Sequence, residues 1–336
     1  MMRSFRMGLA LALIPLSGGT LAAPPMAASE APIANLQAEV TRLTEQAGGK
    51  VGVAAWRLDG TGPKLLVNAD DIYPLASTFK VAVASRILQR VDKGELTLDQ
   101  MIAVKPDKLV PSEVLADRFI HPGLSMSVYN LMELMLTQSD NSATDVLTEL
   151  AGGPAVVTAW LRSQGITGQR IDRDTHGLLR DFYGLPEGPS MDIFAAAPDK
   201  ASFGVRGSQP NPAFDDDPRD QTTPAAMAEL LTRIFTGKAL SPASTKVITG
   251  IMERCRTSPT RLKGILPAHT VVAHKTGTIG GTANDVGVIT LPGNAGQVVI
   301  AVYVKKSRFT PAERDRTIAE IARATYDYFL MTSPAK

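Results

Sequence analysis

The sequence predicts an α+β fold, in which a five-stranded antiparallel sheet with flanking helices is built from both ends of the chain and carries an inserted all-α domain. Two observations support this prediction. β-prone stretches occur near the start of the chain and again near its end, and the segment between them is mainly helical in its apolar spacing. Strands at both ends with helices between them suggest one sheet assembled from both termini. We therefore expect a sheet domain over 29–72 and 245–336 and a helical domain over 73–244.

The individual elements follow from apolar spacing and turn residues. Apolar side chains recur at helical spacing over 35–46 until Gly48 stops the pattern. A hairpin is expected next, because the β-prone stretches 51–58 and 64–68 flank a turn. Further helices are expected at 78–92, 131–138, 143–150, 224–236, 244–252 and 311–330, and further strands at 270–275, 285–291 and 297–305.

The composition is that of a globular protein with no affinity for nucleic acid. Hydrophobic residues make up 44% of the 336 residues, and the net charge is only +2. The single cysteine, Cys255, excludes an intramolecular disulfide, and we interpret it as a small buried hydrophobe. The four histidines lie singly, without metal-ligand spacing, so we expect no metal site and no other cofactor: His121, His176, His269 and His274.

The N-terminus has the pattern of a secretory signal peptide. Arg3 and Arg6 precede the apolar stretch 7–16, and small residues follow around Ala22. This stretch is shorter than the roughly 18 apolar residues that a membrane span requires. We therefore expect a signal peptide over 1–28, no membrane span, and a periplasmic or secreted mature protein that is monomeric by default.

The first chemical motif lies where an irregular segment becomes a helix. Ser77 and Lys80 are three residues apart, so their side chains share one helix face at its positive end. A serine hydroxyl is a poor nucleophile unless a base activates it, and Lys80 can serve if the site depresses its pKa. By itself the motif also fits a helix cap followed by a surface lysine.

A second motif, Ser139-Asp140-Asn141, lies between two expected helices. Asp and Asn hold a tight turn there and direct the Ser139 hydroxyl and the Asn141 amide outward. A hydroxyl beside Ser77 could pass a proton to a leaving nitrogen, and an amide could hold a substrate carbonyl. In isolation this tripeptide equally fits an ordinary interhelical turn.

The third motif is expected at the end of a strand, although in isolation it equally fits a strand end followed by a flexible turn. Lys275 would supply positive charge, Thr276 a hydroxyl for a carboxylate, and the Thr278 N–H an oxyanion donor beside the Ser77 N–H. Gly277 would let a substrate approach the backbone.

The three motifs in this order are far more specific than any one alone, and they are the signature set of β-lactamases and penicillin-binding proteins. The chain resembles a class A serine β-lactamase over nearly its whole mature length. Within that class, the segment 254–291 is similar to the extended-spectrum branch. The resemblance implies the β-lactamase/transpeptidase fold and a serine acyl-enzyme. It also places Arg261 where family members can carry an arginine that binds the substrate carboxylate; the alternative is a surface arginine.

The chain departs from this family in the omega loop, which we expect to be extended over about 170–220. Thr175 falls where the family carries its deacylating glutamate, and the insertion 184–218, rich in Pro, Gly and Asp, predicts an irregular surface excursion. Three carboxylates could compensate, although none matches the family motif: Asp174, Asp181 and Glu187. An ion pair between Arg173 and Asp220 would close the base of the loop.

These residues favour a hydrolase that opens the β-lactam ring through an acyl-enzyme on Ser77, a role in antibiotic resistance. One alternative is a D-alanyl-D-alanine peptidase acting on cell-wall peptides, which the departure at Thr175 favours. Another is a β-lactam-binding protein that is acylated and deacylates slowly. In each case the partner is a small β-lactam or a D-Ala-D-Ala peptide, and no nucleic acid is expected.

Overall fold

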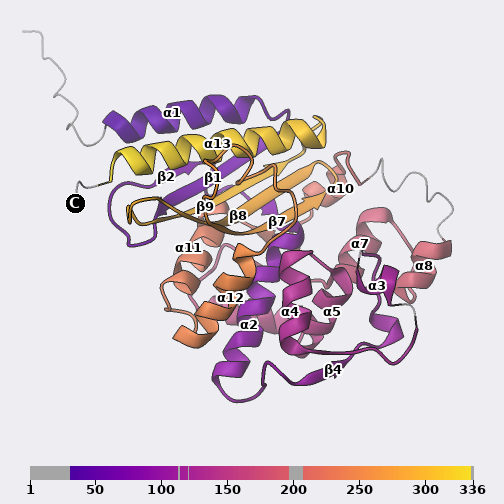
Figure 1. Cartoon of the computed structure of the whole chain (residues 1–336). Coiled ribbons are helices and arrows are strands. Elements are labelled where there is room, and N and C mark those ends of the chain that lie inside the picture. The colour runs from indigo at the N-terminus through magenta and orange to yellow at the C-terminus, as the bar shows by residue number, and fades with distance from the viewer. Residues whose placement is uncertain (1–30, 113, 120, 197–206, 334–336) are drawn as a thin grey trace, which may run out of the picture.

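The computed structural model describes residues 31–112, 114–119, 121–196 and 207–333. The expected signal peptide, 1–28, lies outside the described residues. A five-stranded sheet lies between two helical layers (Figure 1). Its strands are β1 (Lys50–Arg57), β2 (Leu65–Val67), β7 (Val272–Ile279), β8 (Thr282–Thr290) and β9 (Gln297–Lys305).

Strand pairing joins the two ends of the chain. The order is β2-β1-β9-β8-β7, and every neighbouring pair is antiparallel. The central contact is between β1 and β9, in which Lys50 lies opposite Lys305 and Arg57 opposite Val298. The predicted α+β fold, with a five-stranded antiparallel sheet built from both termini, is thereby confirmed.

Both faces of the sheet are covered, which explains its nearly continuous apolar strands. Along β1, Val53 and Ala55 pack in the core beneath α1 (Ala31–Glu45) and α13 (Pro311–Met331). Ala54 and Trp56 point the other way, into the core shared with the helical region.

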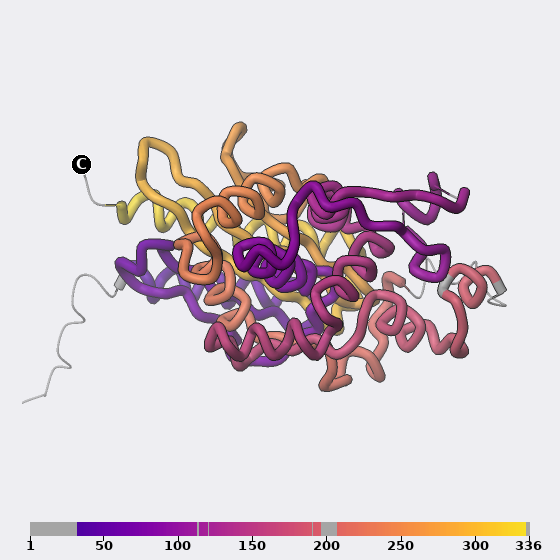
Figure 2. Tube along the Cα trace, turned by 90° about the horizontal axis from the view of Figure 1, so that it is seen from below, coloured from indigo at the N-terminus to yellow at the C-terminus, as the bar shows by residue number. Residues whose placement is uncertain are grey.

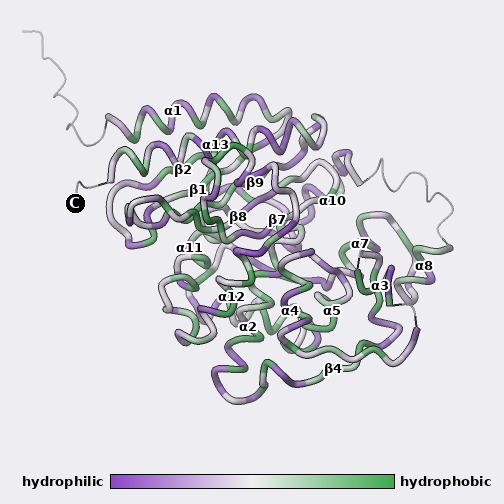
Figure 3. Tube along the Cα trace, in the orientation of Figure 1, coloured by the Kyte–Doolittle hydropathy of each residue, from purple (hydrophilic) through white to green (hydrophobic). Residues whose placement is uncertain are grey.

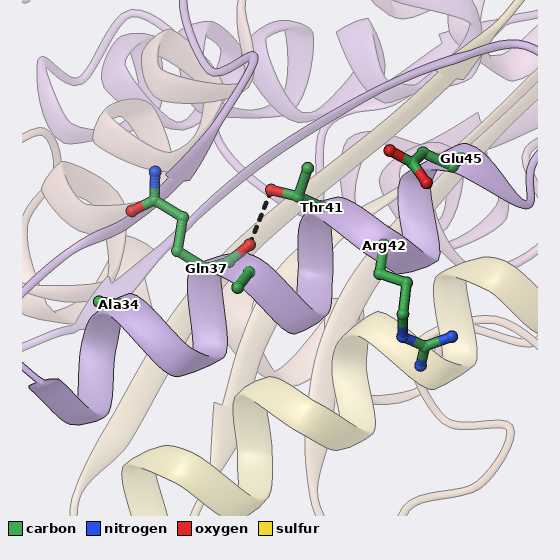
Figure 4. A pocket seen from close by; sticks show the side chains of 6 residues that line it. Ala34, Gln37, Thr41, Arg42 and Glu45 are labelled. Carbon is green, nitrogen blue, oxygen red and sulfur yellow. Dashed lines mark hydrogen bonds between the residues drawn. The ribbon is translucent and has the colours of Figure 1, made fainter.

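Helix α1 is amphipathic, as the alternating colours along it in Figure 3 indicate. Its outer side carries a shallow hollow lined by residues of this helix alone, among them Gln37 and Thr41 (Figure 4). The Thr41 hydroxyl donates to the Gln37 carbonyl oxygen at 2.7 Å. Since this hollow lies on the opposite side of the sheet from the helical region, it takes no part in the site described below.

The helical region is packed around α2 (Lys80–Asp92), whose residues from Lys80 to Ser85 are all buried. The remaining long helices are α4 (Val128–Thr137), α5 (Asn141–Leu150), α6 (Pro154–Ser163), α11 (Pro224–Phe235) and α12 (Pro242–Glu253). Short elements connect them: β3 (Tyr73–Pro74), η1 (Ala76–Phe79), β4 (Met101–Ala103), η2 (Pro106–Lys108), α3 (Leu115–Arg118), β5 (Ser125–Ser127) and β6 (Gln221–Thr222).

The insertion 184–218 is more regular than expected. Helix α7 (Thr175–Tyr183) leads into it, and the described part of the insertion contains α8 (Ser190–Ala196) and α10 (Pro212–Asp215). The expectation of an irregular excursion is therefore wrong for these stretches. Leu178 and Phe182 of α7 form a small apolar core with Phe214, Ala76 and Ile279, and burial of these side chains holds the helices in place.

The extended loop forms one end of the molecule. Figures 1 and 2 both place α7 and α8 beside the segment that contains η2 and α3, and α8 contacts η2. The N-terminal part of the loop forms helix α7. The N-cap of this helix is Asp174, which accepts a hydrogen bond from the Gly177 N–H at 2.8 Å.

Candidate active site

A cleft of about 290 Å³ lies where the edge strand β7 meets η1 and the turn between α4 and α5. Its polar lining comes from all three sequence motifs and from two connecting segments: Ser77, Ser112, Gln138, Ser139, Asn141, Thr257, Ser258, Thr276 and Thr278. Residues that are far apart in the chain thus converge on one concave surface, the usual form of a small-molecule site.

Ser77 lies in the 3-10 turn η1, which runs directly into α2. The preceding residue, Ala76, has φ +43°, a left-handed conformation that costs an alanine free energy. Strand β7 packs against this turn, and a Cβ on Gly277 would lie only 3.2 Å from the Ser77 nitrogen. Gly277 is therefore required for the strand backbone to pass this close to Ser77.

Lys80 is fully buried beneath the cleft. Its ammonium donates to the Ser139 carbonyl oxygen at 2.7 Å, to Ser139 Oγ at 3.1 Å and to Asn141 Oδ1 at 2.9 Å. Burial, with the nearby positive charge of Lys275, holds the pKa of Lys80 well below its usual value. The environment therefore favours the neutral amine, which can accept a proton.

Ser139 lies between two lysines. Lys275 Nζ also donates to Ser139 Oγ, at 3.0 Å, and to the Thr276 carbonyl oxygen at 2.8 Å. Burial lowers the pKa of Lys275 to about 8. The turn that presents Ser139 is held by Asp140, the N-cap of α5, which accepts from the Ala143 N–H at 2.8 Å and from Ser112 Oγ at 2.8 Å.

The third motif lies inside strand β7 rather than at its end, which corrects our expectation, and it does not form the alternative flexible turn. The strand continues to Ile279, and Gly277 pairs with Asn284 of β8. Asn284 Nδ2 donates to the carbonyl oxygens of Pro74 and Leu75, which ties the β8 strand to the segment before Ser77. Continued pairing with β8 keeps this motif rigid.

Arg261 is only 3% exposed, so the alternative of a surface arginine is wrong. Its guanidinium pairs with Asp315 at 2.7 Å and donates to the carbonyl oxygens of Gly277 and Asn284. The remaining nitrogen, Nη2, donates to Thr278 Oγ1 at 2.8 Å. Arg261 therefore supports the cleft strand from behind and reaches the cleft through Thr278.

None of the three loop carboxylates considered for deacylation is among the residues that line the cleft. Asp181 pairs with Arg173, Arg180 and Arg219. Glu187 pairs with Arg180 and has 86% of its side chain exposed. Asp174 serves as the N-cap described above.

The base of the loop is closed by the expected ion pair. Arg173 Nε lies 2.6 Å from Asp220 Oδ2, and both side chains are buried. Asp220 also accepts the backbone N–H groups of Asp172 and Arg173, so it fixes both chain segments of the loop.

Sequence reasoning missed Asp145. Its buried carboxyl group accepts the N–H of Thr175 at 2.7 Å and of His176 at 2.9 Å, so it anchors the position where the family's glutamate was expected. Burial, reinforced by Asp174, raises the pKa of Asp145 to about 7. The spacing in the sequence could have indicated Asp145, because it follows Asn141 by four residues and shares its helix face.

Fold and cleft together are those of a serine acyl-transfer enzyme with two lysines around its hydroxyl groups. The chain matches the model of the beta-lactamase enzyme family over residues 35–329, and it belongs to this family. The resemblance to class A serine β-lactamases is confirmed.

The relatives with names are β-lactamases. Beta-lactamase VEB-1 of Pseudomonas aeruginosa is 29% identical over 312 residues, which cover 90% of this chain and 93% of the relative. Extended-spectrum beta-lactamase PER-1 of the same species is 31% identical over 83% of this chain and 82% of its own length. A solved ancestral class A β-lactamase is 35% identical, with a TM-score of 0.71, over 87% of this chain and 99% of that one.

Proposed function

We propose that this enzyme hydrolyses β-lactam antibiotics through an acyl-enzyme on Ser77. The observation that carries the proposal is the convergence of two hydroxyl groups, Ser77 and Ser139, and two buried lysines, Lys80 and Lys275, on one cleft. The family membership of the chain supports the same activity, which would protect a cell from these antibiotics.

In the acylation step, Lys80 takes the proton of Ser77 while the serine oxygen attacks the lactam carbonyl carbon. The depressed pKa of Lys80 supports this role, because a base must be neutral to accept a proton. The developing oxyanion is held by the N–H groups of Ser77 and Thr278, which Gly277 allows to lie on adjacent backbones.

As the carbon–nitrogen bond breaks, the lactam nitrogen needs a proton. Ser139 donates it, since its hydroxyl group touches both ammonium groups and can be resupplied from Lys80. The substrate carboxylate is held by Lys275 and by the hydroxyls of Thr276 and Thr278, with Arg261 orienting Thr278. Asn141 offers its amide to a substrate carbonyl group.

Deacylation is the step in which this enzyme departs from its family. A water molecule must be activated within hydrogen-bond reach of a base. Thr175 falls where the family's glutamate is expected, and the three loop carboxylates are engaged elsewhere: Asp174 as a cap, Asp181 and Glu187 in ion pairs. We propose that Lys80 activates the water as well, and that deacylation is slower than acylation.

The missing glutamate also favours a second function, a D-alanyl-D-alanine peptidase whose acyl-enzyme is resolved without that residue. Export to the periplasm or the medium fits both functions, and so does a monomer. No helix in the described part of the chain is long and apolar enough to cross a membrane.

Stopped-flow measurements with a chromogenic cephalosporin test the proposal. We expect a burst equal to the enzyme concentration, followed by many slower turnovers. A burst that stops after one equivalent would indicate a β-lactam-binding protein. Release of D-alanine from a D-alanyl-D-alanine peptide, with little cephalosporin turnover, would identify a peptidase.

A further inference from the structure

The two backbone N–H groups of the oxyanion hole each lie next to an apolar residue of the same small cluster. Ala76 comes directly before Ser77, and Ile279 comes directly after Thr278. Both apolar side chains belong to one buried cluster, together with three others: Leu178, Phe182 and Phe214. Neither belongs to the two larger cores of the described residues. The segments that carry the two N–H groups are thus tied to one cluster.

Most of this cluster comes from the extended loop. Leu178 and Phe182 lie on α7, and Phe214 lies on α10, near the end of the sheet where β7 turns into β8 (Figure 1). These three side chains are only 4–6% exposed. Because buried apolar surface is costly to return to water, the cluster opposes separation of the loop from the cleft strand.

Phe182 packs directly on the turn that follows Ile279. Gly280 has φ +56°, and a Cβ there would lie 3.1 Å from two atoms of the Phe182 ring. The Gly280 N–H donates to the Gly207 carbonyl oxygen at 2.9 Å, and its carbonyl oxygen accepts from Nη1 of the buried Arg314 at 2.7 Å. Since both backbone groups of Gly280 are engaged, the ring packs on a rigid surface.

Phe182 is itself held from two directions. Its ring is nearly perpendicular to the Phe214 ring, with the centroids 5.2 Å apart, an arrangement that the quadrupoles of aromatic rings favour. Asn211 Nδ2 donates to the Phe182 carbonyl oxygen at 3.1 Å, which joins the end of α7 to the residue before α10. These contacts restrict where the Phe182 ring can lie.

Ala76 needs support of this kind because its backbone is strained. Its φ of +43° lies in the left-handed region, which costs a non-glycine residue free energy and persists only where the surroundings enforce it. The Ser77 N–H belongs to the peptide group that joins the two residues, so release of the Ala76 conformation would turn this donor. Ile279 bears in the same way on the neighbouring Thr278.

We propose that Phe182 is a positioning residue for the oxyanion hole. As part of the cluster, its ring holds the two backbone segments that carry the Ser77 and Thr278 N–H groups, so that both donors point at the same oxygen. This inference rests on the proposed function, because the oxyanion forms when Ser77 attacks the β-lactam carbonyl carbon. Phe182 acts through these segments and does not touch the reacting atoms.

The affinity of phenylboronic acid tests the proposal without any β-lactam turnover. Boron accepts the Ser77 oxygen, the hydroxyl proton passes to a base, and the tetrahedral anion that forms places an oxygen in the oxyanion hole, as the transition state does. Phe182→Ala should weaken this affinity at least about tenfold, a part of the roughly 10²–10³-fold effect of losing a donor altogether. Acylation by a chromogenic cephalosporin should slow by a similar factor.

Two comparisons separate positioning from a general loss of structure. Binding of the intact cephalosporin, measured in Ser77→Ala protein, should stay within about twofold when Phe182→Ala is added, because the carboxylate contact with Lys275 remains. The matched control is Phe329→Ala, which removes another buried ring, from the core beneath α1 and α13. It should lose comparable stability in urea and keep its affinity for phenylboronic acid within about twofold. Phe182→Leu, which keeps most of the apolar contact, should recover most of the loss.

Ala76→Gly tests the cluster from the other side, even if Phe182→Ala does not fold. Glycine adopts φ +43° at no steric cost, so this variant should remain folded, but it lacks the methyl group that packs in the cluster. Its affinity for phenylboronic acid should fall about threefold. In the double variant with Phe182→Ala, the loss should be smaller than the product of the two single losses, because both changes act through one cluster.

Several results would overturn the proposal. One is an unchanged affinity for phenylboronic acid in folded Phe182→Ala or in Ala76→Gly, and another is an equal loss in Phe329→Ala. An equal loss of cephalosporin binding in Ser77→Ala protein also overturns it, because the whole cleft would then have changed. If the wild type binds phenylboronic acid at Ser77 but does not hydrolyse β-lactams, while Phe182→Ala weakens that binding as described, the proposed function has failed and the positioning role stands.

Discussion

The cleft and the extended loop beside it are held together in opposite ways. In the cleft, two lysines share one serine hydroxyl group, and both of these hydrogen bonds join residues far apart in the chain. In the loop, Arg173 pairs with Asp181, Asp217 and Asp220, so ion pairs hold the segments together. The polar groups proposed for acylation line or contact the cleft, whereas these loop aspartates pair with an arginine.

This difference predicts that activity and stability can be changed independently. Changes in the cleft should act on acylation, while changes in the ion pairs of the loop should act on the stability of the protein. The predictions below are arranged from the largest expected effect to the smallest.

Ser77→Ala should abolish both the burst and steady-state hydrolysis, a loss of at least about 10⁴-fold, because the nucleophile is removed. Mass spectrometry after incubation with a cephalosporin should show no covalent adduct, whereas the wild type gains the mass of one acyl group. Hydrolysis that survived this change would mean that Ser77 is not the nucleophile.

Lys80→Met should slow acylation about a thousandfold, the usual contribution of a general base. In the wild type the acylation rate should rise with pH as Lys80 loses its proton, at a pKa that burial and Lys275 hold below its usual value. It should fall again above about pH 8 as Lys275 loses its proton. Single-turnover rates from pH 5 to 10 measure both the rise and the fall of the acylation rate. If the rise with pH persists in Lys80→Met, a group other than Lys80 causes it.

Arg173→Ala should lower the free energy of unfolding by about 3–5 kcal/mol, because it leaves the buried carboxylate of Asp220 without its cation. Urea unfolding measures this change. The control is Arg219→Ala, which removes a half-exposed arginine from the same network and should cost less than about 1 kcal/mol. If the two variants lose equal free energies of unfolding, burial does not determine how much each arginine stabilises the loop.

Asp145→Asn should alter how stability depends on pH. The folded-state pKa of Asp145 is raised to about 7, above the roughly 3.9 of an unfolded aspartate, so its protonated form is favoured by folding. Its stabilising contribution is complete below about pH 4 and is lost as pH rises towards 7, by about 1.4 kcal/mol for each unit of pKa shift. The wild type should therefore lose stability relative to Asp145→Asn over this range. If the difference in free energy of unfolding between the wild type and Asp145→Asn is the same at pH 4 and pH 7, the prediction is wrong.

Asp181→Asn should leave the deacylation rate within about twofold, because this carboxylate is engaged by arginines and does not line the cleft. Steady-state turnover at saturating cephalosporin measures that rate. A large fall with an unchanged burst would make Asp181 the deacylating base after all.

Much of this structure could be predicted from local patterns. The hairpin of β1 and β2, the helices around α2 and the paired sheet follow from apolar periodicity, since a side chain's face is set by its position in a strand or helix. The insertion was harder to predict, because α7, which leads into it, depends on apolar side chains that meet Phe214 and Ile279 from elsewhere in the chain.

The sequence by itself determined the chemical groups of the site, because the three motifs contain two hydroxyl groups and two amines. They belong to Ser77 and Ser139 and to Lys80 and Lys275. Only the tertiary structure decided which groups share the cleft. Arg261 lies behind β7, and Asp181 and Glu187 pair with arginines. The reason is physical: burial and charge pairing depend on neighbours that approach through space, and no local spacing in the chain specifies them.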